Sequence, residues 1–417
     1  MAEPVSVAGP VGTPVIRRRP DHPIRNHQID PDAMKIVYRL DRMGFAAYVV
    51  GGAVRDLLVG RTPKDFDVAT DARPGQIKKR FSNAYVIGRR FRLVHVRFQG
   101  NKVIEVATFR KMTEAVDVGE MQAEIVLVDS FGTPAEDALR RDITINALFY
   151  DPIGEAVIDS VGGLEDLARR TVRCIGDPAV RFMEDPVRIW RVLRHAARLD
   201  FKLEENLARA IPESLPLLAH CSGSRLYEEL NKDLAQSPGR VLAKLREYGA
   251  LGSILGRSGR AYERDGAAFD KLADLLDRMD RSRAAGAAWE LPELYAILFV
   301  PLAEEILLHP PPDPHVAVLD LMLSPGTTAT IPRKLRADVS QIMFILGHML
   351  RALPSGRMRW SLRERAHYPQ AARLCWLLVK GRPPAPDGES FESLFAERHP
   401  SDGTPGKKPR RRRRRSK

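Results

Sequence analysis

Two aspartates with one residue between them are the clearest candidates for chemistry in the sequence. Asp65 and Asp67 belong to a stretch, Asp65 to Thr70, whose composition predicts a short strand. Side chains two apart on a strand share a face, so we expect the two carboxylates side by side, with Phe66 and Val68 in the core. Adjacent carboxylates repel each other unless a cation lies between them. Sites of this kind bind Mg²⁺ together with substrate phosphates, and Mn²⁺ is expected to substitute for it.

A glycine pair precedes the aspartates. A short apolar run that ends at Val50 is typical of a buried strand, and Gly51-Gly52 follows it. Glycine lets the backbone turn tightly and bring its N–H groups against a ligand. Ala53 to Val59 is expected to form one short helix, whose N-terminus would favour a phosphate above the glycines. The order strand, turn, helix, strand therefore predicts a site for a phosphorylated substrate and a divalent cation.

A third carboxylate usually completes such a metal site, and the sequence offers two candidates. Glu105 belongs to a predicted strand, Val103 to Phe109, from which it could face the aspartate pair, although a glutamate in a hairpin is commonly solvated. Asp142 directly follows Arg140 and Arg141. Taken alone, the two arginines would be assigned to a solvated helix face. These observations leave both acids as candidates.

An aspartate and an arginine three residues apart form a further candidate site. Asp185 and Arg188 are expected on one face of a helix that runs to about Leu199. They offer an acceptor and a forked donor that could recognise a base edge, whereas in isolation an intrahelical ion pair of little energetic consequence is the ordinary interpretation. Basic residues continue along the helix in a stripe that could follow RNA or triphosphate: Arg191, Arg194 and Arg198.

These motifs together resemble a known family. Gly51-Gly52-Ala53-Val54-Arg55-Asp56 followed by Asp65-Phe66-Asp67 is similar to the head of the polymerase-beta-like nucleotidyltransferases. Within that superfamily, it resembles the class that contains bacterial poly(A) polymerases and tRNA CCA-adding enzymes. Arg140 to Ala147 matches the Arg-Arg-Asp motif of this class, and Glu184 to Arg188 matches its Glu-Asp-x-x-Arg motif. The resemblance covers about residues 31 to 235.

The resemblance implies a role for each motif. Asp65 and Asp67 would bind Mg²⁺ and activate the 3′-hydroxyl of RNA, and the resemblance favours Asp142 over Glu105 as the third acid. The incoming ATP would be bound by Gly51, Gly52 and Arg55 at the triphosphate, by Arg140 and Arg141 at the ribose and phosphates, and by Asp185 and Arg188 at the adenine, with Arg191 beside them.

The stretch from Val86 to Val96 bears on which activity is present. It resembles the signature that separates bacterial poly(A) polymerases from CCA-adding enzymes, although His95 by itself is expected to be an ordinary structural histidine. The sequence therefore predicts adenylate addition to RNA 3′ ends from ATP, with release of pyrophosphate, in RNA processing and decay. Addition of CCA, or of only A or CC, to tRNA is the alternative. An inactive RNA-binding protein on the same scaffold is a second alternative.

Charge is concentrated at the end of the chain. The formal net charge is +13 over 417 residues, and the last eleven residues alone carry nine positive charges. A block of this kind binds polyanions, which fits mRNA, tRNA and other transcripts as partners, and it could also recruit RNA-decay proteins. Three scattered cysteines, scattered histidines and the lack of an apolar run long enough for a membrane predict a cytoplasmic protein without disulfides or zinc.

The periodicity predicts an α+β protein in which a small mixed-sheet head is followed by an all-helical neck and body. Residues 111 to 136 show little periodicity and are expected to form a mobile flap within the head. The predicted divisions are a flexible arm (1–30), a catalytic head (31–170), a neck that binds nucleotide and RNA (171–235), a helical body (236–381) and a disordered basic tail that binds RNA (382–417).

Overall fold

The computed structural model describes residues 13–88, 93–111, 131–323, 329–355, 358 and 360–381. Most of the predicted flap, the basic cluster at 89–92 and the tail from residue 382 lie outside these ranges. The chain divides into two compact units between Leu217 and Leu218, inside the segment predicted as the neck. Each unit is described by itself.

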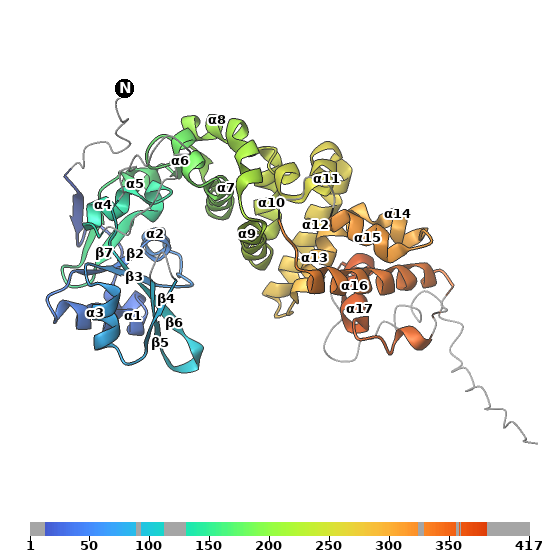
Figure 1. Cartoon of the computed structure of the whole chain (residues 1–417), viewed down its shortest axis with the longest axis horizontal. Helices are drawn as coiled ribbons and strands as arrows, with labels where there is room; N and C mark the ends of the chain where they lie inside the picture. Colours follow the sequence, from blue (N-terminus) through green and yellow to red (C-terminus); the bar gives the residue numbers. More distant parts are fainter. Residues whose placement is uncertain are drawn as a thin grey trace, which may run out of the picture. The chain divides into compact units, whose positions relative to one another are not determined.

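The first unit is built on a mixed sheet of eight strands (Figure 1), in the order β1-β8-β7-β2-β3-β6-β5-β4. The central strands β3 and β6 are parallel, and the other neighbours are antiparallel. This sheet and the surrounding helices confirm the predicted α+β class. The strands are β1 (Val15–Arg18), β2 (Ala47–Val50), β3 (Asp67–Thr70), β4 (Ala84–Ile87), β5 (Leu93–Arg97), β6 (Val103–Thr108), β7 (Leu148–Asp151) and β8 (Ala156–Asp159).

Helices surround this sheet and continue beyond it. α1 packs on β2 and β3, α3 packs on β4 and β5, and α2 packs on β2 and β7. A small parallel pair, β9 (Thr171–Val172) with β10 (Lys202–Leu203), ties together the segments on either side of α6 and α7. The helices of this unit are α1 (Pro31–Asp41), α2 (Gly52–Leu58), α3 (Pro74–Arg80), α4 (Pro134–Leu139), α5 (Gly163–Ala168), α6 (Pro178–Glu184), α7 (Val187–Leu199) and α8 (Glu205–Ser214).

A buried apolar cluster joins the middle of the sheet to the segment that contains the Arg-Arg-Asp motif. Its aromatic centre is Phe109 and Phe149, whose rings meet edge to face with centroids 6.1 Å apart. The cluster consists of Val50, Ala69, Phe109, Ala138, Ala147, Phe149 and Ile175. Because the ends of strands and helix α4 pack in this core, the backbone positions from which their side chains emerge are fixed relative to one another.

The strand of the aspartate pair begins later than predicted. β3 starts at Asp67, so Asp65 and Phe66 lie in the connection that leads into it. The neighbouring strand β2 explains this start, because its last residue, Val50, pairs with Asp67 and the chain then turns away at Gly51. Phe66 is consequently only half-buried, whereas Val68 is fully buried as predicted.

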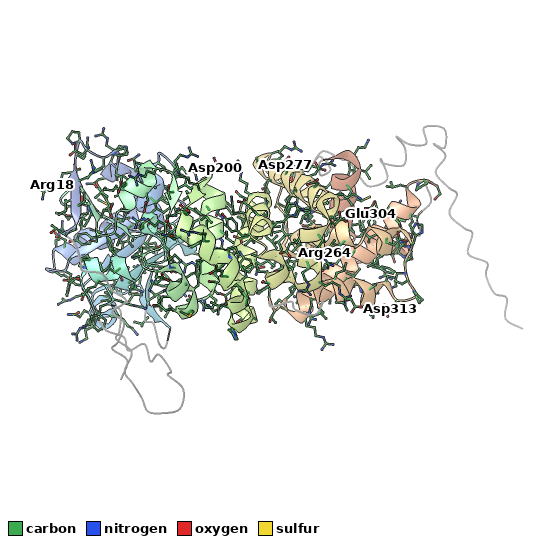
Figure 2. The ribbon with its side chains drawn as sticks, turned by 90° about the horizontal axis from the view of Figure 1, so that it is seen from above. Arg18, Asp200, Arg264, Asp277, Glu304 and Asp313 are labelled. Atoms are coloured by element: carbon green, nitrogen blue, oxygen red, sulfur yellow. The ribbon has the colours of Figure 1, made fainter. Side chains whose placement is uncertain are left out.

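The described part of the N-terminal arm is attached to the sheet and is not free. Residues Val15–Arg18 form the edge strand β1, antiparallel to β8, and Arg18 projects from the outer margin (Figure 2). The prediction of a flexible arm over residues 1–30 is therefore wrong for this strand. The start of α1 follows a local signal in the sequence, because the side chain of Asp30 accepts hydrogen bonds from the N–H groups of Asp32 and Ala33.

Two helices, and not one, occupy the Glu-Asp-x-x-Arg region. α6 ends at Glu184, Asp185 has the extended values φ −151° and ψ 94°, and α7 starts at Val187. Pro186 accounts for the break, since a residue before proline is disfavoured in the helical conformation. α7 ends at Leu199, and the next residue, Asp200, lies at the surface (Figure 2) in the left-handed conformation, its Oδ2 3.1 Å from Nη2 of Arg170.

The second unit is helical in all of its regular described segments. Two of its helices have weak signals in the sequence: α11, whose glycines disfavour a helix and whose Gly256 kinks it at φ 59°, and the short α15. The helices are α9 (Gly223–Ala235), α10 (Pro238–Glu247), α11 (Leu251–Arg264), α12 (Gly266–Ala284), α13 (Leu291–Phe299), α14 (Glu304–Leu308), α15 (Pro314–Met322), α16 (Arg333–Ala352) and α17 (Tyr368–Lys380).

Nowhere in the described ranges does a helix combine the length and apolar character that crossing a membrane requires.

Candidate active site

The glycine turn and the aspartate pair emerge at the same end of the sheet (Figure 1). Val50 is the last residue of β2 and pairs with Asp67, the first residue of β3, so the turn begins directly beside Asp67. Gly51 has φ 72° and ψ −132°, a conformation that residues with a side chain rarely adopt. Its N–H donates to the carbonyl of Leu148 on β7 at 3.1 Å. The backbone at the start of α2 is therefore fixed next to the acids.

Two guanidinium groups flank the glycines. A β-carbon at position 51 would lie 3.3 Å from Nη1 of Arg141, and one at position 52 would lie 3.5 Å from Nη2 of Arg55. The buried Arg55 donates to Asp56 Oδ1 from Nε at 2.8 Å and from Nη2 at 2.7 Å. The guanidinium carbon of Arg141 lies 5.1 Å from the centre of the Phe149 ring. A turn that admits close approach, with two fixed positive charges beside it, suits a polyphosphate.

Glu105 lies directly opposite Asp67. The two residues are paired in register on the parallel strands β3 and β6. Asp67 is accessible to solvent but is backed by protein atoms, and this partial desolvation is the largest cause that raises its pKa to about 6. The negative charges of Glu105 and Asp65 add to the rise, while Arg141 opposes it. The aspartate pair and Glu105 thus form a group of acids whose negative charges Arg141 balances only in part.

His95 contacts this group through Glu105. It is paired in register with Glu105 from the antiparallel strand β5, and its Nε2 lies 3.4 Å from Glu105 Oε1. The two side chains are partly exposed. His95 is therefore a neighbour of the acidic group.

Asp137 fixes the two arginines of the Arg-Arg-Asp motif. Its carboxylate is 1% exposed and accepts hydrogen bonds from Nε of Arg140 at 2.9 Å and from Nε of Arg141 at 3.1 Å. The backbone N–H of Arg110 donates to the same carboxylate at 3.1 Å. Because one buried acid binds both guanidinium groups, their positions are coupled. Arg141 also donates to the carbonyl of Asn146 at 3.2 Å.

The buried Arg181 of α6 binds the backbone of the Arg-Arg-Asp motif. Its Nη2 donates to the carbonyls of Arg140 and Arg141 at 2.7 and 3.1 Å, and its Nη1 lies 2.7 Å from Glu184. Burial, followed by the charge of Arg188, lowers the pKa of Arg181. The helix that carries the Glu-Asp-x-x-Arg motif is thereby attached to the Arg-Arg-Asp motif through backbone groups.

Asp142 is bound by arginines of α7. Its Oδ1 accepts from Nε of Arg188 at 3.0 Å, and its Oδ2 lies 2.7 Å from Nη1 of Arg191. Nη1 of Arg188 also lies 2.7 Å from Glu184. Burial opposes the charge of Arg188, but the hydrogen bond to Glu184 and the charge of Asp142 outweigh it and raise the pKa of Arg188. Both oxygens of Asp142 are thus engaged by cations, and the carboxylate that faces Asp67 is Glu105.

The spacing predicts that Asp185 and Arg188 share one helical face, but the structure does not place Asp185 on the helix of Arg188. It lies in the break between α6 and α7, where its Oδ1 accepts from the N–H of Val187 at 3.3 Å. The negative charge of Asp185 still acts on Arg188 and contributes to the rise of its pKa. Asp185 and Arg188 are therefore close in the chain and electrostatically coupled, while the hydrogen-bond partners of Arg188 are Asp142 and Glu184.

The acids at the sheet end fit a divalent cation in chemistry, although they do not enclose one. Within the ranges that the structure describes, no cluster of three or more His, Cys, Asp or Glu side chains could hold a metal ion. Mg²⁺, however, is commonly bound by one or two carboxylates and completed by substrate phosphates and water. Glu105 and Asp65 add negative charge beside Asp67, which a cation would balance, so the donor set suits a metal that arrives with a nucleotide.

Several functional contacts escaped the sequence analysis. Asp137 could have been found, because it precedes Arg140 and Arg141 by three and four residues, the spacing of neighbours on a helix. Asn146 and Arg181 gave no local signal, since their partners lie 91 and about 40 residues away.

Two protein families match parts of the chain. Residues 47–173 match the family described as the poly A polymerase head domain. Residues 200–255 match the family described as the probable RNA and SrmB-binding site of polymerase A. The first match contains the glycine turn, the acids and the Arg-Arg-Asp motif; the Glu-Asp-x-x-Arg motif lies between the two matches.

Curated relatives include both kinds of enzyme that the sequence motifs suggest. The chain is 44% identical to poly(A) polymerase I of Salmonella typhi over 237 residues, which are 55% of this chain and 51% of that protein. It is 36% identical to the CCA-adding enzyme of Enterococcus faecalis over 277 residues, 66% of this chain and 64% of that protein. The chain spans about half the length of the poly(A) polymerases that it matches.

Solved structures extend the likeness over most of the fold. The CCA-adding enzyme of Bacillus stearothermophilus in complex with CTP is 25% identical, with a TM-score of 0.59 over 89% of this chain and 98% of that one. The CCA-adding enzyme of Thermotoga maritima complexed with tRNA-CCA is 21% identical, with a TM-score of 0.55 over 88% of this chain and 78% of that one, which shows a shared fold.

Proposed function

We propose that this chain, a member of the nucleotidyltransferase superfamily that includes poly(A) polymerase I and the CCA-adding enzymes, adds adenylates to RNA 3′ ends. The donor is ATP and the leaving group is pyrophosphate. One observation carries the proposal: the register of β2, β3 and β6 aligns the glycine turn with Asp67 and Glu105. A triphosphate on the turn would therefore lie beside the acids that a metal-assisted transfer needs.

The triphosphate would occupy the turn at Gly51 and Gly52. Arg55 and Arg141 supply fixed positive charge there, and Arg140 is tied to the same anchor, Asp137. Phosphoryl and nucleotidyl transfer depend mainly on positioning and on neutralising charge, so rigid donors are more effective than mobile ones. The absence of a β-carbon at both glycines lets the phosphates approach the backbone at the start of α2 closely.

Asp65 and Asp67 would hold Mg²⁺, or Mn²⁺ in its place, with Glu105 as the third acid. The opposition of Glu105 and Asp67 supports this choice over Asp142, whose oxygens are bound by Arg188 and Arg191. When bound, the cation neutralises triphosphate charge and lowers the pKa of the attacking 3′-hydroxyl. The protein groups orient the α-phosphate between the hydroxyl and the leaving pyrophosphate, and Asp67, once deprotonated, provides the negative charge that retains the cation.

Adenine would be selected by Asp185 and Arg188, with Arg191 beside them. The contacts of Arg188 with Asp142 and Glu184 restrict its guanidinium to one orientation. A fixed fork of donors next to an acceptor can distinguish one base edge from another. Asp142 therefore has a supporting role in this proposal: it fixes the arginines that face the base.

Addition of CCA to tRNA is a second candidate function. The CCA-adding relatives and the structures that match most of this fold support it. The basic tail favours a polymerase for many RNAs, because nine charges near the end of the chain would raise affinity for any RNA backbone without base contacts. We propose RNA 3′ ends of several classes as substrates, with RNA-decay proteins as partners of the tail.

The decisive experiment measures single-nucleotide incorporation by the purified protein with Mg²⁺. Each radiolabelled nucleotide is supplied alone to an unstructured RNA and to a tRNA that lacks its CCA end. Long tails from ATP on both RNAs support the proposal. Addition that is confined to C, C and A on the tRNA would overturn it in favour of CCA addition. The variant Asp67→Asn serves as the inactive control, and no incorporation by wild type would leave only an RNA-binding role.

A further inference from the structure

A chain of three side chains connects the glycine turn to α7. Nη1 of Arg55, which follows the turn, donates to Oδ1 of Asn146. Nδ2 of Asn146 lies 3.1 Å from Nε2 of His195 on α7. The three residues come from α2, from the 3₁₀ helix Thr144–Asn146 and from α7, so the contact joins three separate segments of the first unit.

The donors and acceptors of this chain allow one arrangement. A guanidinium group has donors and no acceptor, so the side-chain oxygen of Asn146 must face Arg55. The NH₂ group of Asn146 then faces His195, and Nε2 of His195 must be the acceptor. His195 is consequently neutral, with its proton on Nδ1. The contact would be lost if Nε2 carried a proton, because two donors would then face each other.

The surroundings of His195 favour the same neutral form. His195 is partly buried, and desolvation by the surrounding protein is the largest cause that holds its pKa well below the ordinary value. The neighbouring positive charges act in the same direction: they are Arg55 from α2 and Arg191, Arg194 and Arg198 from α7 itself. An unprotonated acceptor is therefore available to Asn146 at neutral pH.

We propose that His195 is a positioning residue for nucleotide binding, which acts through Asn146 on Arg55. By accepting from the NH₂ group, His195 prevents the amide from turning and keeps its oxygen on Arg55. The same helix carries Arg188 and Arg191, which contact Asp142. His195 thus links the helix of the proposed base site to the arginine of the proposed triphosphate site. This inference rests on the nucleotidyl transfer proposed above.

Loss of the acceptor should act mainly on nucleotide affinity. With leucine at position 195, the Asn146 amide is held only by its bond from Arg55, and the orientation that places its oxygen on Arg55 is less strongly fixed. Arg55 would keep Asp56 as a partner and would lose its second anchor. We expect the KM for ATP to rise about tenfold, with a change of less than threefold in kcat at saturating ATP, because the acids are not touched.

Substitutions at position 195 can distinguish the effect of the hydrogen-bond acceptor from the effects of side-chain size and polarity. In His195→Gln, Oε1 is as many bonds from Cα as Nε2 of histidine, so the acceptor is restored and the KM for ATP should return to within about twofold of wild type. In His195→Asn, the amide reaches only to the place of Nδ1 and should behave like His195→Leu. His27→Leu, at an exposed histidine of the same unit, is the matched control and should leave both constants unchanged.

The experiment measures KM and kcat for ATP with saturating RNA, and the melting temperature, for each variant and for Asn146→Ala and the double variant His195→Leu/Asn146→Ala. If His195 acts through Asn146, the double variant should raise KM no more than Asn146→Ala alone. Equal KM values in wild type and His195→Leu, or no rescue by glutamine, would overturn the inference. An inactive wild type would instead overturn the proposed function, so the two failures can be told apart.

Discussion

Asp67 and Glu105 stand opposite each other on the parallel strands β3 and β6, while Asp142 is bound by Arg188 and Arg191. Neighbouring strands are about 4.8 Å apart, so side chains of paired residues share one face and one local field. This pairing explains why the charge of Glu105 acts on the pKa of Asp67. It also separates two acids that are both candidates in the sequence: Glu105 belongs to the acidic group and Asp142 to the arginines of α7.

The first prediction compares Glu105→Gln with Asp142→Asn. Glu105→Gln removes a charge beside Asp67 and should lower kcat by about 100-fold or more, with a weaker apparent affinity for Mg²⁺. Asp142→Asn should leave the Mg²⁺ dependence near wild type, raise the KM for ATP by about tenfold, and weaken the preference for ATP over CTP, because Arg188 and Arg191 lose their shared acid. Steady-state kinetics at several Mg²⁺ and nucleotide concentrations would measure both effects. If the two variants exchanged these behaviours, Asp142 would be the third acid after all.

The second prediction concerns the stability of Asp67→Asn. The pKa of Asp67 is raised to about 6 in the folded protein, above the usual value of an aspartate, so the folded state binds this proton more tightly than the unfolded state does. The contribution of Asp67 to the free energy of unfolding therefore falls as pH rises from about 4 through 6. At neutral pH, the negative charge of Asp67 is destabilising. Because the side chain is accessible to solvent, we discount the effect to below about 1 kcal/mol. Asp67→Asn should be inactive yet melt about 1–3 °C higher in EDTA at pH 7.

The effect of Mg²⁺ on the melting temperature provides a control for the Asp67→Asn variant. Added Mg²⁺ with ATP should raise the melting temperature of the wild type and have little effect on Asp67→Asn, since ligands stabilise only a state that binds them. At pH 5, where Asp67 is largely protonated, the difference in EDTA should shrink. A lower melting temperature for Asp67→Asn at pH 7 would contradict the interpretation of the raised pKa.

Local signals predicted the elements that carry the turn and the acids. The apolar run that ends at Val50, the glycines and the Asp30 cap depend on residues close in the chain, and β2, α2 and α1 formed where these signals indicated. The hairpin at Gly100 and Asn101 is of the same kind, because both residues adopt the positive φ values that such a turn requires.

Features that depend on distant partners could not be predicted in this way. β1 has two exposed apolar residues followed by two arginines, with no alternation, and becomes a strand only because β8 pairs with it. The roles of Glu105 and Asp142 depend on which strand and which helix lie next to them. Asp185 was placed on a helix from spacing alone, whereas Pro186 ends the helical conformation there. Asn146 contacts Arg55 and His195, which are distant in the chain, whereas Asp137 has a local signal in its spacing to Arg140 and Arg141.

The third prediction tests the anchor of the two arginines. Asp137→Ala leaves Arg140 and Arg141 without their buried partner and should destabilise the first unit by about 2–4 kcal/mol, since a buried ion pair is broken from one side. It should also raise the KM for ATP by about tenfold or more, because both guanidinium groups become mobile. Urea unfolding and steady-state kinetics measure the two effects.

A second buried aspartate supplies the control for that variant. Asp159 accepts hydrogen bonds from four backbone N–H groups, those of residues 161–164. Asp159→Ala should lose stability to a comparable degree while the KM for ATP stays within about twofold of wild type. If both variants raised the KM equally, the effect would come from general loosening of the unit and not from the arginines.

The last prediction concerns the basic tail. Its nine positive charges within eleven residues should bind RNA phosphates without reading the bases. Removal of residues 382–417 should therefore weaken the binding of an unstructured RNA and of a tRNA alike at low salt. The slope of the logarithm of the binding constant against the logarithm of salt concentration should become shallower by as much as about 6, from about 0.7 per phosphate contact. Incorporation of AMP on a saturating RNA should continue at a similar kcat, because every proposed site residue lies in the first unit.

A variant with the nine basic residues replaced by glutamine keeps the length of the tail and should match the truncation. An unchanged salt slope would mean that the tail does not contact RNA, whereas a loss confined to tRNA would point to recognition of one folded substrate and so to CCA addition.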